Sequence, residues 1–288
     1  MKFRTEINVN MSDLRVVTGD KIVTCGSCFA ENIAKQLTDA GFSVDINPFG
    51  MVYNPSSLAK SFTELLDEKK YTAGELFQYE NLYHSFAHNS RFSDRTPDAV
   101  LDKINTRLQY SSAFLRDANI LIITFGTAYV YRLREIGEVV SNCHKLPENR
   151  FIRNRLSADD ILKEWNPLLN RLKDENKSLN IIFTVSPIRH FRDGFHENQL
   201  SKSVLLLATD ELIKGHSGFC HYFPAYEILL DDLRDYRFYD DDLLHPSNKA
   251  VDYILEKFSE MFFDKTTVLT VSEFKKTQKT LRHKPLIV

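Results

Sequence analysis

Cysteine is scarce in this sequence, and its four cysteines are too few and too unevenly spaced for a disulfide-stabilised scaffold. Reduced thiols are expected at Cys25, Cys28, Cys143 and Cys220. No apolar run reaches the ~18 residues that a transmembrane helix requires, and the first residues contain no apolar signal-peptide core. These absences predict a cytoplasmic protein without a membrane-spanning segment.

The chain also lacks a marked excess of charge of either sign. Its 37 lysines and arginines are balanced by 39 acidic residues, which gives a formal net charge of −2. Such a balance supplies no general attraction for nucleic acid or for an anionic membrane surface. We therefore expect neither of these as a partner.

What the sequence does have is enough apolar material for a large core, since 43% of its 288 residues are hydrophobic and 12% are aromatic. We find no repeat, low-complexity segment or convincing linker. The sequence therefore predicts one domain over residues 1–288, with a core from about 20 to 265 and an arm at each end.

Short apolar or β-branched segments alternate with segments of helical periodicity along the chain. The predicted strands lie at 21–25, 42–46, 119–124, 180–185 and 220–223. Strands that alternate with helices predict a mainly parallel sheet with helices on both faces. The expected fold is a flavodoxin-like three-layer α/β/α sandwich with the strand order 2-1-3-4-5.

Two segments interrupt this alternation. Residues 129–133 and 138–140 predict an inserted β-hairpin. Residues 71–95 are aromatic and polar without clear periodicity, and we interpret them as a long loop that is either a lid over the site or ordinary packing.

The stretch 21–37 reads as a strand, a tight turn at Gly26-Ser27-Cys28 and a helix. A turn that leaves the carboxyl end of a strand and enters a helix directs backbone N–H groups at whatever lies above the sheet. Ser27 and Cys28 are therefore candidate nucleophiles. With strands 1 and 3 as neighbours, this turn should meet Gly126-Thr127 with Gly50 nearby, so the nucleophile and the oxyanion donors of these loops should converge at one point.

Asp242 and His245 precede the last predicted helix with the spacing D-x-x-H. An imidazole that takes the proton of a hydroxyl or thiol, and a carboxylate that orients the imidazole, are what a weak nucleophile requires. One tight turn can present both side chains, so we expect them to meet the first turn above the sheet.

The motif Gly26-Ser27-Cys28-Phe29-Ala30 resembles the signature of the GSCFA family. The supporting stretches are NPFGMVYNP (47–55), TFGTAYVYR (124–132), VSPIRHFRDGF (185–195) and DLLHPS (242–247). The family resembles the SGNH, or GDSL-like, hydrolases, which are flavodoxin-like esterases. The resemblance implies an esterase or deacylase acting on a small or carbohydrate-linked acyl ester, with no metal and no organic cofactor.

The hydrolase pattern does not transfer completely. Laying Gly-Asp-Ser-hydrophobic on residues 26–29 puts Cys28 in the nucleophile position, whereas a shift by one residue would select Ser27. The asparagine that donates to the oxyanion in the third block is absent, because Gly126-Thr127-Ala128-Tyr129 occupies that block. Thr127, Asn54 or a backbone N–H would have to replace this asparagine. Gly50 matches the glycine of the second block, and Asp242 and His245 match the last block.

The helix N-terminus and a protonated His245 could lower the pKa of a cysteine at this turn, which would favour Cys28 as a thiolate. Arg189 and His190 follow the fourth strand and are expected to line the substrate side of the crevice.

Other functions remain open from the residues alone. The same fold could act as an acyltransferase or as a binding module without turnover. Cys25 and Cys28 form a C-x-x-C that would suit a thiol redox protein, and Cys25, Cys28, Cys143 and His144 have side chains that can bind zinc. The simplest structural interpretation is that Ser27 caps the helix and Cys28 is a small buried thiol.

Overall fold

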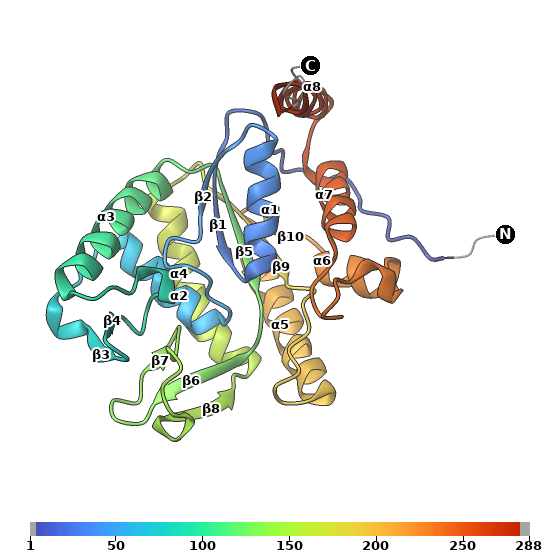
Figure 1. The fold of residues 1–288 in the computed structure, drawn as a ribbon. Coiled ribbons are helices and arrows are strands. Elements are labelled where there is room, and N and C mark those ends of the chain that lie inside the picture. Colours follow the sequence, from blue (N-terminus) through green and yellow to red (C-terminus); the bar gives the residue numbers. More distant parts are fainter. Residues whose placement is uncertain (1–3, 283–288) are drawn as a thin grey trace, which may run out of the picture.

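The structure is a computed structural model that describes residues 4–282, and its centre is a five-stranded parallel sheet (Figure 1). Its strands are β1 (Lys21–Gly26), β2 (Ser43–Ile46), β5 (Ile120–Phe125), β9 (Asn180–Val185) and β10 (Cys220–Tyr222). The strand order is β2-β1-β5-β9-β10, and every neighbouring pair is parallel. This is the predicted order 2-1-3-4-5, so the expected flavodoxin-like topology is confirmed.

Helices cover both faces of this sheet. One layer contains α1 (Cys28–Asp39) and α7 (Asn248–Phe262), and the other contains α2 (Pro55–Leu66), α3 (Pro97–Arg116), α4 (Ala158–Glu175) and α5 (Phe195–Gly215). The remaining helices are α6 (Ala225–Glu227) and α8 (Lys265–Arg282), with a π-helical turn at Ile228–Asp232. Four 3-10 turns lie at Ala73–Glu75, Ser90–Phe92, Glu148–Arg150 and Tyr236–Phe238.

Strand β5 shows why the sheet needs helices on both sides. Ile120 and Ile122 pack into the layer of α1 and α7, whereas Leu121, Ile123 and Phe125 pack into the layer of α2 to α5. Successive side chains of a strand point to opposite faces, and all six residues of β5 are buried. The continuous apolar run in the sequence therefore marks a strand that is covered twice.

The segment 71–95 differs from the predicted loop. It contains an antiparallel hairpin of β3 (Phe77–Tyr79) and β4 (Leu82–His84), closed by Glu80 and Asn81, which both have positive φ. Two such residues form the tight turn that matches the twist of a hairpin. Strands of three residues are too short to produce a periodic pattern, which explains why the sequence did not reveal them.

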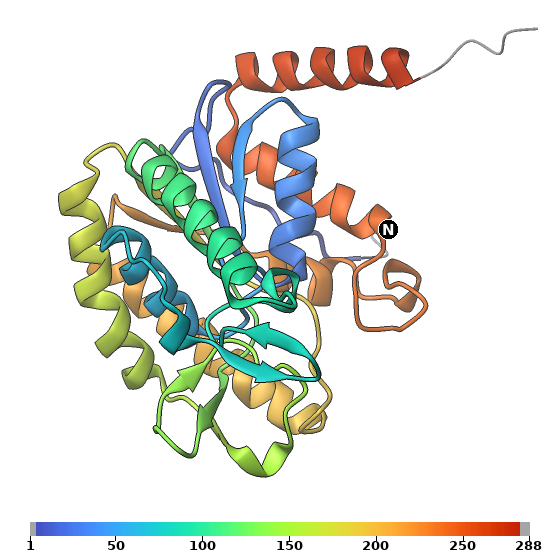
Figure 2. The same cartoon turned by 60° about the vertical axis from the view of Figure 1, so that its left-hand side comes forward.

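The inserted hairpin at 129–140 is present and is larger than predicted. Strand β6 (Tyr129–Leu133) pairs with β7 (Val139–Val140), and β8 (Phe151–Arg155) pairs along the other edge of β6. The resulting three-stranded sheet lies at the end of the molecule opposite to α8 (Figure 2). Its strand order is β7-β6-β8. The small sheet extends the region above the carboxyl ends of the parallel strands.

The segments at the two ends of the chain contact each other. The N–H of Val16 donates to the carbonyl of Phe262, and Val16 is fully buried rather than exposed on a surface arm. Beyond α7 the chain forms α8, whereas the sequence predicts an arm there. The final residues of that arm lie outside the described part of the chain.

Candidate active site

The turn between β1 and α1 places Cys28 at the start of a helix. Gly26 ends β1 with φ +143°, and a Cβ atom there would lie 2.3 Å from the carbonyl oxygen of Thr124 on the neighbouring strand. Only glycine allows β1 and β5 to approach so closely before the chain turns. Ser27 is extended, and Cys28 is the first residue of α1. The backbone N–H of Cys28 therefore has no carbonyl acceptor one turn earlier in the helix.

Cys28, His245 and Asp242 form a continuous chain of contacts. The Sγ of Cys28 lies 3.4 Å from Nε2 of His245, and Nδ1 of His245 lies 2.5 Å from Oδ2 of Asp242. The other carboxylate oxygen of Asp242 accepts the N–H groups of Leu244 and His245 at 2.8 and 2.9 Å. Leu243 between them has φ +57°, and this tight turn places the carboxylate of Asp242 at Nδ1 of the imidazole whose Nε2 faces the thiol.

The charges at this site differ between the carboxylate and the thiol. The two backbone N–H groups and the imidazole lower the pKa of Asp242 to about 2, so this carboxylate is ionised. Burial raises the pKa of Cys28, although the N–H groups of Cys28 and Phe29 at the helix start oppose that effect. The helix start thus lowers this pKa as expected, but desolvation of the thiolate is the larger effect and raises it overall. Cys28 is therefore a neutral thiol that needs a base.

Ser27 points away from this site. Its side chain is fully buried, and its Oγ donates a hydrogen bond to Oγ of Ser186, which follows β9. Of the two candidate nucleophiles, the structure brings Cys28 to the imidazole and places Ser27 beneath the turn. The side chain of Ser27 makes no capping hydrogen bond to α1 either.

The glycine loops that were expected to hold an oxyanion are already hydrogen-bonded. The N–H groups of Gly126 and Thr127 donate to the carbonyl of Tyr53 at 2.8 and 3.0 Å. The N–H of Gly50 donates to the carbonyl of Asn47, and a Cβ on Gly50 would lie 2.2 Å from Asn89. These three N–H groups fix the loops around the site rather than remaining available to a substrate.

Asn54 is better placed than these loops to donate. Its Oδ1 caps α2 by accepting the N–H of Ser57, and its Nδ2 donates one hydrogen to the Ser57 hydroxyl at 3.0 Å. An amide nitrogen has two hydrogens, so one donor remains. Asn54 lines the cavity that contains Cys28. Thr127 also lines it, but its hydroxyl is engaged with Ser201 and with the N–H of Tyr129.

The cavity above Cys28 has a volume of about 860 Å³. Its walls come from the loop after β2, strands β6 and β8, the segment 140–148 and the loop after β9. Arg189 and His190 both line it, as predicted. Burial lowers the pKa of His190 to about 4, so its ring is neutral, and its Nε2 has no partner in the described structure. The ring of Tyr53 meets the ring of His190 edge-on at 6.1 Å.

The aromatic segment 71–95 is not part of the wall of this cavity as the structure describes it. Phe77, Tyr79 and Phe86 instead pack against the small apolar cluster of the β6–β8 sheet. The N–H of Ser141 donates to the carbonyl of Phe86, so the segment supports the cavity wall from behind. Of the two interpretations of this segment, packing describes its place in the structure.

Lys202 was not identified from the sequence, although it is buried against the loops that follow β5 and β9. It is 1% exposed, and its ammonium donates to the carbonyls of Gly126 and Ser186 at 2.7 and 2.6 Å. Burial lowers its pKa to about 7. A lysine on the apolar side of a helix that also carries Leu205 and Leu212 was the available signal.

Cys25 and Cys28 face different environments. Cys25 is 5% exposed within the core layer of α2 to α5, whereas Cys28 packs at the edge of the opposite layer. All four cysteines are free. Among the described residues no group of three or more histidine, cysteine or acidic side chains is arranged to hold a metal ion. A Cys25–Cys28 redox pair would require one of the two side chains to leave its layer.

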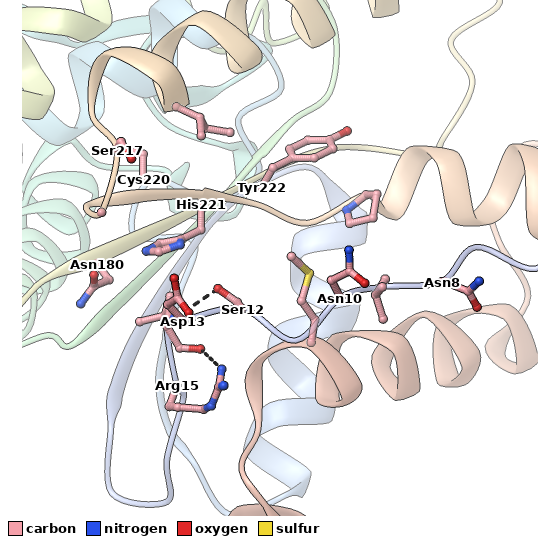
Figure 3. Close-up of a pocket in the computed structure, with 16 residues that line it drawn as sticks. Asn8, Asn10, Ser12, Asp13, Arg15, Asn180, Ser217, Cys220, His221 and Tyr222 are labelled. Carbon is pink, nitrogen blue, oxygen red and sulfur yellow. Dashed lines mark hydrogen bonds between the residues drawn. The ribbon is translucent and has the colours of Figure 1, made fainter.

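A second cavity, of about 800 Å³, lies at the β10 edge of the sheet (Figure 3). His221 of β10 faces Asp13 of the N-terminal segment there, and the guanidinium of Arg15 donates to the carbonyl of Leu14. No residue of the Cys28 site belongs to its described lining. Cys28 and His245 therefore line the first cavity and not the second.

The doubly wound sheet, with a thiol, an imidazole and a carboxylate above its switch point, defines the class of this protein: a flavodoxin-like α/β protein whose candidate site lies where that topology opens a crevice. Within that class the chain belongs to the GSCFA family, whose sequence model matches residues 21–258.

Solved structures that are similar to this chain include two esterases. A carbohydrate esterase family 3 protein from Talaromyces cellulolyticus has 10% identity and a TM-score of 0.39, covering 88% of this chain and 99% of that one. An acetyl xylan esterase from the rumen bacterium Butyrivibrio proteoclasticus has 11% identity and a TM-score of 0.37, covering 85% of this chain and 65% of that one. No curated protein matches the sequence. No helix in the described residues is both long and apolar enough to cross a membrane.

Proposed function

We propose that this protein is a cysteine-dependent hydrolase that cleaves acyl esters, including acyl groups carried on carbohydrates. The observation that carries the proposal is the chain of contacts from Cys28 through His245 to Asp242, at 3.4 and 2.5 Å. A thiol whose pKa is raised by burial gains nucleophilicity only if a neighbouring base removes its proton, and His245 is within reach of it.

The proposed reaction has two halves. In the first, Nε2 of His245 takes the proton of Cys28 while Sγ attacks the ester carbonyl, and the same proton then leaves with the alcohol as a thioester forms. In the second, His245 takes a proton from water, the resulting hydroxide attacks the thioester, and the proton returns to Sγ as the carboxylic acid departs. The ionised Asp242 holds Nδ1 of His245 protonated and leaves Nε2 free to act as the base.

The oxyanion of each tetrahedral intermediate needs donors that the structure has not already used. The N–H of Cys28 at the start of α1 and the remaining amide hydrogen of Asn54 are our candidates. A missing donor of this kind typically costs about 2.7–4 kcal/mol of transition-state stabilisation. Asn54→Ala should therefore lower kcat by roughly 10²-fold while the fold persists, apart from the cost of losing the α2 cap.

Hydrolysis of 4-nitrophenyl acetate by the wild type and three variants tests the proposal. Cys28→Ala should abolish turnover, and His245→Gln should lower kcat by about 10²-fold or more, since general-base catalysis contributes that much. Ser27→Ala is the matched control, because its hydroxyl bonds Ser186 below the turn and should leave most of the turnover intact. Mass spectrometry of the wild type should detect one acetyl group on Cys28. Full turnover by Cys28→Ala would exclude the proposed nucleophile.

A binding module that has kept the fold without turnover is the second candidate. It is favoured by one observation: the N–H groups of Gly50, Gly126 and Thr127 are all occupied by carbonyl acceptors. This alternative predicts that acetyl and longer acyl esters bind without any acylation of Cys28. Acylation in the mass spectrum would exclude it. An acyltransferase would give the same acyl-enzyme, and the product of added sugar alcohols would distinguish it from a hydrolase.

A further inference from the structure

The cavity above Cys28 is lined by more cationic than anionic side chains, although the whole chain carries a net charge of −2. Lys145, Arg153, Arg189 and Arg192 line it, and Glu148 is the acidic residue among the lining residues that the structure describes. A cleft lined by one sign of charge concentrates ligands of the opposite sign. The excess is local, so it is not explained by composition.

The ion pairs in this cavity leave two of the cations without a carboxylate. Arg153 pairs with Asp193, and Arg192 pairs with Glu148. For Lys145 and Arg189 the described residues provide no carboxylate partner. The pair of Arg192 is largely exposed, so it contributes little and can be exchanged for a ligand.

Arg189 is held in place by contacts that do not neutralise it. One of its Nη atoms donates to the carbonyl of Leu243 at 2.5 Å, and its guanidinium lies 4.6 Å from the ring centre of Tyr239 and 5.4 Å from that of Phe191. Its Nε is buried without a partner, as is the Nε of Arg153. A guanidinium fixed in this way keeps its charge and loses little side-chain freedom when an oxyanion binds it.

The position of Arg189 links this charge to the proposed chemistry. Leu243 lies in the turn between Asp242 and His245, so Arg189 is bonded to the same turn that presents the imidazole to Cys28. Leu244 and His245 line the cavity together with Arg189. An anionic group bound by Arg189 would therefore lie next to the reacting ester.

We propose that the ester cleaved at Cys28 carries an anionic oxygen group, a carboxylate or a phosphate, and that Arg189 and Lys145 bind it with the help of Arg192. This inference rests on the proposed function but specifies the substrate class, which that function leaves open. Neutral acyl esters should react by the same route, with a lower kcat/KM.

Matched esters test the inference in the wild-type protein. We would compare two anionic esters with the neutral 4-acetoxybenzamide. The anionic esters are 4-acetoxybenzoate, which carries a carboxylate, and 4-acetoxyphenyl phosphate, which carries a phosphate. The expected result is a kcat/KM at least tenfold higher for one or both anionic esters, and the better of the two identifies the group. Equal values for all three esters would overturn the inference.

Variants separate binding of the anion from positioning of His245. Lys145→Met and Arg189→Met should reduce the preference for the anionic ester severalfold. Because Arg189 also contacts Leu243, a loss that is equal for the neutral ester would indicate positioning alone and would count against anion binding at Arg189. Arg171→Met on the outer surface of α4, where Arg171 pairs with Asp67 and Glu175, is the control and should leave the preference unchanged.

A binding experiment keeps this inference distinct from the proposed function. Calorimetric titration of the Cys28→Ala protein with 4-hydroxybenzoate, 4-hydroxyphenyl phosphate and 4-hydroxybenzamide needs no turnover. Tighter binding of an anionic ligand that is lost in Cys28→Ala/Arg189→Met would support the inference even if no ester were hydrolysed, in which case the proposed function would fail alone. Equal binding of the charged and neutral ligands would refute the inference even if all three esters were cleaved.

Discussion

Replacing Asp242 by asparagine removes one negative charge and leaves a side chain of nearly the same shape. The Oδ1 atom can still accept the N–H groups of Leu244 and His245, at 2.8 and 2.9 Å in the wild type, so the turn should keep its conformation. The atom 2.5 Å from Nδ1 of His245 becomes an amide nitrogen that donates instead of accepting. The imidazole must then protonate Nε2, and it can no longer take a proton from Cys28.

The size of the effect follows from what is lost. General-base catalysis is worth about 10²–10⁴-fold, and an Asp→Asn change that imposes the wrong tautomer in a serine protease triad costs about 10⁴-fold. We therefore expect kcat for 4-nitrophenyl acetate to fall by roughly 10²–10⁴-fold in Asp242→Asn. Asp241→Asn, one residue earlier in the same acidic run, removes the same charge without touching His245 and is the matched control.

Alkylation of Cys28 provides a second measurement, in which Asp242→Asn should make the thiol more reactive rather than less. Asp242 is one of the charges that raise the pKa of the thiol, so its removal should shift the pH dependence of iodoacetamide labelling toward lower pH. A variant with intact labelling and lost turnover would have lost the base and kept the nucleophile. Turnover within threefold of the wild type in a folded Asp242→Asn protein would refute the reasoning.

Three further predictions concern stability. Burial lowers the pKa of Lys202 to about 7, so between that pH and pH ~10 the unfolded chain holds a proton that the folded chain lacks. In urea unfolding over this pH window, the stability of the wild type should rise relative to that of Lys202→Met by about 1.4 kcal/mol per pH unit. A stability difference that does not change with pH would contradict this. Gly26→Ala would place a Cβ 2.3 Å from the carbonyl oxygen of Thr124, so circular dichroism should detect a large fall in melting temperature or no folded protein, and an unchanged melting curve would exclude the clash. Trp165→Phe removes a hydrogen bond from Nε1 to the carbonyl of Pro55 and leaves a cavity, with an expected loss of about 1–3 kcal/mol in urea unfolding; a loss below ~0.5 kcal/mol would mean that the core closes around the smaller ring.

The sequence predicted the parallel sheet well, because each of its strands is a short apolar run between helices of clear periodicity. Five strands in a doubly wound order leave few topologies, since crossovers are right-handed and short. That order also brings the end of β1 next to the end of β5. The meeting of Cys28 and His245, 217 residues apart in the chain, was expected on another ground: the D-x-x-H sequence follows the last predicted strand and matches the last block of the hydrolase pattern.

Local motifs that lack periodicity were predicted less well. The hairpin of β3 and β4 depends on two residues with positive φ, Glu80 and Asn81, and neither is glycine. Strand β8 pairs with β6 across an irregular segment, so its existence depends on the partner strand rather than on its own sequence. Helix α8 has no strong apolar face that would mark it as a helix in the sequence.

What the sequence determined by itself is the set of chemical groups and the edge of the sheet at which they collect, because alternation and spacing are local properties. What the tertiary structure decided is which of those groups are available. Ser27 and Cys28 are neighbours in the sequence, yet their side chains point to different partners at the start of α1. The hydroxyl of Ser27 bonds to Ser186, whereas the thiol of Cys28 contacts His245. The carbonyl of Tyr53 likewise occupies the N–H groups of Gly126 and Thr127, and no spacing within either segment reveals that contact.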